Sequence, residues 1–155
     1  MLSLPNGTLL VLTPLSGFAS LQLTPFAARG LTQTLELIGA SGPGGQWVRR
    51  DVNGFARSLA DTRFRKYRST ITCTDGETPC LDDAWIGETC EVSCALELNY
   101  VTGATPARPA VSGSSRTEGT VTFYRPQLIM LVENIKNSFA EWQARNSWQI
   151  DLMEI

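Results

Sequence analysis

The chain has 155 residues, of which 43% are hydrophobic and 18% charged, and its formal net charge is −2. This length suits one domain that buries a core without covalent support, and the composition excludes a disordered chain. No apolar run is long enough to span a membrane, and histidine, the commonest general base and metal ligand, is absent. We therefore expect a globular protein that is not an enzyme, holds no cofactor or metal, and is not associated with a membrane.

Apolar and polar residues alternate with a period of two over most of the chain, which predicts β-strands. The first residues have no basic segment before their apolar run, so they favour a strand over a signal peptide. We expect an all-β protein, a single-domain antiparallel β-sandwich or barrel over residues 1–155, with long loops and at most one short helix. The predicted strands are 8–12, 19–24, 32–38, 64–73, 90–100, 119–136 and 147–155.

Two predicted hairpins follow from local sequence. Asn53-Gly54 lies between two strand-like runs, and this pair favours a type I′ turn because both central residues need positive φ. In residues 131–145 a helix competes with a strand, since apolar residues also recur at helical spacing. We favour a strand and a hairpin there, with its turn near residues 145–147.

Two segments rich in Gly, Pro, Ser and Thr interrupt this pattern, at residues 40–46 and 102–119. The second is too long for an ordinary connection in a compact domain. We expect it to be a flexible loop or to be held by a partner.

All four cysteines lie in the stretch CTDGETPCLDDAWIGETCEVSC, residues 73–94. If residues 90–94 are extended, Cys90 and Cys94 are about 13 Å apart, too far to bond to each other or to share one zinc ion. Strands 64–73 and 90–98 are expected to be antiparallel neighbours. Nested pairing would then bring Cys73 close to Cys94 and Cys80 close to Cys90, either as thiols or as disulfides.

Charge is divided into two blocks. Residues 49–68 are rich in arginine, whereas residues 75–97 are acidic and contain no Lys or Arg. Either neighbouring strands pair these charges within the monomer, or two opposite patches meet head to tail between subunits. The net charge and the lack of a recognition motif disfavour nucleic-acid binding. The candidate interface residues are Arg49, Arg50, Arg63, Arg65, Lys66, Arg68, Asp82, Asp83 and Glu88.

Three phrases of the sequence resemble small structural proteins from the tail tip or baseplate of tailed bacteriophages, of the distal-tail or upper-baseplate type. They are RRDVNGFARSLADTRFRKYRSTITCTD, PCLDDAWIGETCEVSCALELNY, and FYRPQLIMLVENI with the final alternating strand. The resemblance implies a β-sandwich or barrel that forms a homo-oligomeric ring about the tail axis and joins the tail tube to the tail-tip hub. It implies no catalytic residues, and Cys80 and Cys90 depart from its pattern.

The resemblance and the residues together predict a virion structural protein that assembles in the host cytoplasm. Two alternatives remain open. One is a secreted or surface β-sandwich binding module with disulfides and tryptophan-lined ligand contacts. The other is a capsid decoration or head-to-tail connector subunit.

Overall fold

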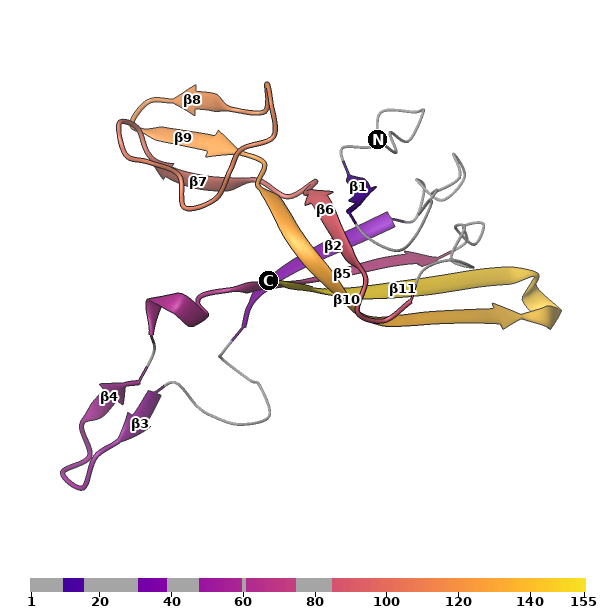
Figure 1. Cartoon of the computed structure of the whole chain (residues 1–155), viewed down its shortest axis with the longest axis horizontal. Helices are drawn as coiled ribbons and strands as arrows, with labels where there is room; N and C mark the ends of the chain where they lie inside the picture. The colour runs from indigo at the N-terminus through magenta and orange to yellow at the C-terminus, as the bar shows by residue number, and fades with distance from the viewer. Residues whose placement is uncertain (1–9, 16–30, 39–47, 60, 75–84) are drawn as a thin grey trace.

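The computed structural model describes residues 10–15, 31–38, 48–59, 61–74 and 85–155. In these ranges the chain is all-β, as predicted, with three antiparallel sheets and two short 3-10 helices, η2 (Thr62–Phe64) and η3 (Glu141–Gln143). The largest sheet has six strands and curls into a half-barrel (Figure 1). Its order is β1 (Val11–Pro14), β6 (Thr89–Ser93), β10 (Gln127–Ala140), β11 (Arg145–Glu154), β5 (Tyr67–Thr74) and β2 (Leu31–Leu37).

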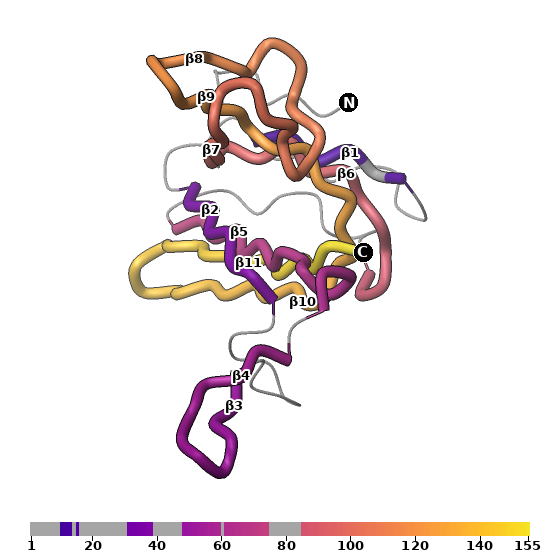
Figure 2. Tube along the Cα trace, turned by 90° about the vertical axis from the view of Figure 1, so that its left-hand side faces the viewer, coloured from indigo at the N-terminus to yellow at the C-terminus, as the bar shows by residue number. Residues whose placement is uncertain are grey.

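Two smaller sheets extend from this half-barrel. One is a hairpin of β3 (Val48–Arg50) and β4 (Ala56–Ser58). The other has the order β7 (Leu98–Val101), β9 (Val121–Tyr124) and β8 (Arg116–Glu118). Figure 2 shows these two sheets at opposite ends of the molecule.

Alternate side chains of the six-stranded sheet face inward and form the core. On β11 these are Trp148, Ile150 and Leu152, which the C-terminal alternation predicts. Side chains from the neighbouring strands complete the cluster, so the concave face of the half-barrel is filled by apolar groups. The buried cluster also contains Leu10, Leu12, Ile71, Cys73, Cys90, Val92, Cys94, Leu128, Met130 and Val132.

A β-bulge at Glu133 keeps both halves of β10 facing the core. Val132 pairs with Leu152 and Asn134 pairs with Asp151, so Glu133 is the extra residue. Val132 and Ile135 are three positions apart and would face opposite sides of a regular strand. Because of the bulge, both contribute to the inward face.

Gln33 joins the two ends of the curled sheet. Its Nε2 donates to Ser69 Oγ on β5 at 3.0 Å, and its Oε1 accepts from the backbone N of Ala95 at 2.8 Å. Ser69 is fully buried, so the amide satisfies a polar group that would otherwise be costly to bury.

The strand predicted at 90–100 is two strands in two sheets. Beyond Ser93, Cys94 N donates to Pro126 O, and Pro126 has no N–H to continue the ladder. The same proline divides the predicted strand 119–136 into β9 and β10. The break in strand pairing at Pro126 therefore separates the half-barrel from the three-stranded sheet.

The expected pairing of strands 64–73 and 90–98 is wrong. β5 pairs with β2 and β11, β6 pairs with β1 and β10, and the β10–β11 hairpin lies between them. The two strands of this hairpin are adjacent in the sequence, so closing the short loop between them costs little entropy. The hairpin takes the central place in the sheet. The strand and hairpin prediction for 131–145 is confirmed, although the turn, 141–144, comes earlier than expected.

The Asn53-Gly54 hairpin is confirmed, but its turn is not type I′. Only Gly54 has positive φ, at +82°, and the loop has three residues, Val52 to Gly54, closed by Asp51 N donating to Phe55 O. This is the pattern of a type I turn followed by a left-handed residue.

Residues 102–119, expected to form a flexible loop or to be held by a partner, instead form part of the fold. They contain β8, and Ala110 makes a β-bridge with Pro126. Val111 N donates to Arg125 O at 2.8 Å. The predicted strand 19–24 and linker 40–46 lie outside the described residues.

We predict that deletion of Glu133 preserves the fold, because it removes the bulge and leaves every core side chain on its face. The free energy of unfolding should fall by less than about 1 kcal/mol, which is the usual contribution of an exposed ion pair such as Arg68–Glu133. Deletion of Asp151 is the control. It places Ile150 directly before Leu152 and forces one of the two side chains outward, which should lower the free energy of unfolding by about 2–5 kcal/mol. Urea unfolding measures both, and equal losses would contradict the role of the bulge.

Candidate subunit interface

The hairpin of β3 and β4, with the turn of η2 that follows it, projects from the body of the protein. We call the described residues 48–59 and 61–65 the arm. Figures 1 and 2 show it extending away from the half-barrel in both views. All six residues of its two strands are exposed, so it has no covered face among the described residues. A two-stranded hairpin of this kind is marginally stable alone in water.

Asp51 organises the tip of the arm. Its Oδ1 accepts from the backbone N of Asn53 at 2.9 Å and of Phe55 at 3.0 Å, and its Oδ2 accepts from Arg57 Nε at 3.1 Å. Desolvation acts to raise the pKa of Asp51, but the hydrogen bonds from Phe55, Arg57 and Asn53 outweigh it and lower this pKa. The carboxylate therefore stays ionised and fixes the turn.

The arm exposes large apolar side chains that a monomer in water would be expected to cover. Val52 at the tip is fully exposed, and Phe55 beside it is 66% exposed. Single exposed apolar residues are ordinary, but several on one small projection mark an interaction surface. The others in the arm are Val48, Leu59 and Phe64.

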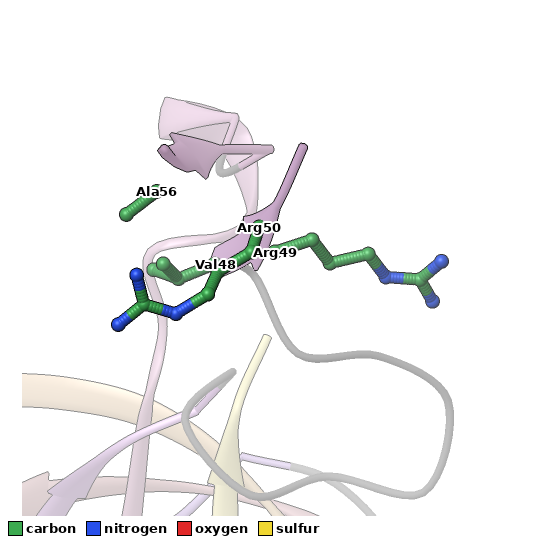
Figure 3. Close-up of a pocket in the computed structure, with 4 residues that line it drawn as sticks. All are labelled: Val48, Arg49, Arg50 and Ala56. Atoms are coloured by element: carbon green, nitrogen blue, oxygen red, sulfur yellow. The ribbon is translucent and has the colours of Figure 1, made fainter. Parts of the chain in front are cut away.

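Arginines flank these apolar groups. Arg49 and Arg50 extend in opposite directions from β3 (Figure 3). Together with Val48 and Ala56 they line an open hollow of about 660 Å³. Arg50 Nη1 donates to Gly54 O at 2.8 Å, while Arg63 pairs with Asp61 at 2.7 Å. The hydrogen bond from Arg63 is the main cause that lowers the pKa of Asp61.

A partly buried ion pair holds the base of the arm against the body. Arg108 Nε donates to Glu154 Oε1 at 2.6 Å, and its Nη2 donates to Arg65 O at 2.6 Å. Glu154 Oε2 also accepts from the backbone N of Tyr67 at 2.8 Å. The hydrogen bond that Arg108 donates to Glu154 raises the pKa of Arg108. This clamp joins residue 108, the end of β11 and the start of β5 at the point where the arm leaves the body.

Among the described residues, charged side chains from both blocks bond to groups outside the opposite block. Arg68 pairs with Glu133 at 3.1 Å, and Lys66 Nζ donates to Ile155 O at 2.6 Å. On the acidic side, Glu97 pairs with Arg116 at 2.8 Å. Of the predicted interface residues, Arg49, Arg50, Arg63 and Arg65 lie in the arm, Lys66 and Arg68 lie at its base, Glu88 lies beside β6, and Asp82 and Asp83 are outside the described residues.

Cys73, Cys90 and Cys94 are buried, and Cys90 and Cys94 are free thiols. Neither nested disulfide is therefore formed in this structure, and Cys80 is outside the described residues. Burial raises the pKa of Cys90 to about 12 and that of Cys94 to about 11. Both thiols act as small apolar core groups, because their reactive thiolate form is disfavoured.

Sequence reasoning found the arginines of the arm but missed its apolar residues and the clamp. Val52 and Phe55 flank the Asn-Gly turn, and an apolar residue beside a turn signal is the cue that could have identified them. Nothing local marks Arg108 and Glu154 as partners, since they are 46 residues apart.

Comparison with protein-family models, curated proteins and solved structures gave no match. Within the described ranges, no three His, Cys, Asp or Glu residues are grouped so that they could hold a metal ion. The same part of the chain has no helix with the length and apolarity to cross a membrane.

We predict that Arg108→Ala lowers the free energy of unfolding by about 2–3 kcal/mol, because it leaves the Glu154 carboxylate, 9% exposed, without its charged partner. Arg116→Ala is the matched control, since Arg116 and its partner Glu97 are 48% and 37% exposed. Denaturant unfolding should show a much smaller loss for this variant. Similar losses in both variants would contradict the role of the clamp.

We also predict a pH dependence from Cys90. Its pKa is higher in the folded state, so its contribution to stability is fully present below about pH 9 and is lost as the pH rises toward about 12. Between pH values of about 8 and 10.5, the wild-type protein should lose more stability than Cys90→Val, which has no thiol to ionise. Parallel unfolding curves would show that Cys90 does not titrate in this way.

Proposed function

We propose that the chain is a structural subunit of a bacteriophage tail tip or baseplate, of the distal-tail or upper-baseplate type. It assembles into a ring of identical copies that joins the tail tube to the tail-tip hub. In this role it binds its neighbours and performs no catalysis. Its place is in the virion tail, after assembly in the host cytoplasm.

The arm is the observation that carries this proposal. It is a separate two-stranded hairpin with apolar side chains in water on a body that has a filled core of its own. Folding of the monomer does not explain why valine and phenylalanine lie at the tip. Burial against another subunit does, since each such side chain contributes about 1.5–3 kcal/mol when it is fully covered.

The all-β fold and the phrases of the sequence that resemble tail proteins support the same function. The first phrase, from Arg49 to Asp75, includes most of the arm and β5. The secreted binding module is less well supported, because it relies on disulfides, and Cys90 and Cys94 are free thiols in the core.

Mass in solution tests this proposal. Light scattering after size-exclusion chromatography, or sedimentation, should give a defined oligomer whose mass is unchanged by reductant. A monomer at high protein concentration would contradict assembly driven by this chain alone. A monomer that unfolds under reductant would favour the secreted module.

The arm variant Val52→Asp/Phe55→Asp should weaken assembly while leaving the fold intact. Losing two buried apolar contacts raises the dissociation constant about 100-fold or more. Val101→Asp is the matched control, since Val101 is 68% exposed on β7, away from the arm. Sedimentation gives the assembly constant, and urea unfolding of the monomer gives the stability. Equal losses of assembly and stability, or an equal effect of the control, would contradict an interface at the arm.

A further inference from the structure

The arm and the rest of the chain carry opposite net charge. The arm has five arginines against two aspartates, a net of +3, which leaves eight Lys and Arg against 13 Asp and Glu elsewhere, a net of −5. The arm also points away from its own body in both views (Figures 1 and 2). It is therefore suited to the body of another copy.

The charge also decides between two kinds of contact. In a two-fold contact between arms, two cationic hairpins would face each other, and like charges at an interface are costly. A contact between the arm of one copy and the body of the next pairs opposite charges. This contact is heterologous, and when its rotation closes it produces a ring.

One surface of the body has exposed apolar side chains beside a carboxylate, which complement the apolar side chains and arginines of the arm. On the outer face of the half-barrel, Ile129 and Ile155 are 52% and 59% exposed, and Ile155 N donates to Ile129 O at 3.2 Å, so they are neighbours. Glu91 lies opposite Ile129 in the β6–β10 ladder. The cluster combines exposed branched aliphatic groups with a carboxylate, which suits an arm of apolar side chains and arginines.

Trp85 and Ile86 extend this cluster toward the other end of the β6–β10 ladder. Both are exposed, and Gly87 N donates to Val132 O at 2.8 Å, which holds the segment against β10. Tryptophan is one of the residue types enriched among those that contribute most of the binding energy at interfaces. We call Trp85, Ile86, Glu91, Ile129 and Ile155 the acceptor patch.

We infer that the arm of one copy docks on the acceptor patch of the next copy, an assignment that rests on the ring assembly proposed above. Val52 and Phe55 pack against the apolar groups of the patch. Arginines of the arm face Glu91. The contact covers the apolar groups of both surfaces, and no residue of it belongs to the buried core.

Crosslinking between two variants tests the assignment. Val52→Cys and Ile129→Cys are made separately in a Cys80→Ser background, mixed in equal amounts and oxidised gently. A docked arm holds the two thiols at a high effective concentration, so the mixed disulfide dimer should exceed that of the control pairs about tenfold or more. The control pairs are Val52→Cys with Val101→Cys, on β7, and Val52→Cys with Trp142→Cys, at the tip of the β10–β11 hairpin.

The mass of the same samples separates the two proposals. An oligomer that links Val52→Cys to Ile129→Cys supports the docking. An oligomer that gives no such link, or that links the arm to residue 142 or 101 equally well, overturns the acceptor patch and leaves ring assembly standing. A monomer without links overturns both.

Discussion

Near the end of β11, the Glu154 carboxylate accepts hydrogen bonds from the backbone of Tyr67 and from the guanidinium of Arg108. It faces the interior, where an unpaired charge would be costly, so its partners are fixed in place. Arg108 in turn donates to the carbonyl of Arg65, the residue after η2. One carboxylate thus sets how residues 102–119, the six-stranded sheet and the base of the arm meet.

A second constraint lies at Pro126, at the other end of the same sheet. Without an N–H, it ends the ladder between β6 and β10 and directs both chains into the three-stranded sheet. The bulge at Glu133 has a comparable role within β10, where it preserves the inward face over a long strand. Together with the amide of Gln33, these features shape the six-stranded sheet into a half-barrel with a filled concave side.

The fold class and several strands could be predicted from the sequence because alternation is a local signal. Trp148, Ile150 and Leu152 show it plainly, and so does the hairpin that contains Asn53-Gly54. Which strands pair was not predictable in the same way. The sequence order suggested β5 beside β6, whereas the local β10–β11 hairpin lies between them. The arginines of the arm were visible as a charge block, but the exposure of Val52 and Phe55 depends on the path of the whole chain.

The arm connects the physical description to the proposed function. A marginal hairpin with apolar side chains in water is held at a fixed base, and the body beyond it is acidic and carries exposed aliphatic groups. A partner that covers the arm would stabilise it as well as bind it, so assembly and local order should be coupled.

Amide hydrogen exchange of the arm at low and high protein concentration tests this coupling most directly. We expect the amides of residues 48–59 to exchange rapidly in the monomer and to become protected in the oligomer, while those of β8 and β9 do not change. If the mass rises with concentration and the arm still exchanges at its monomer rate, the arm is not the interface.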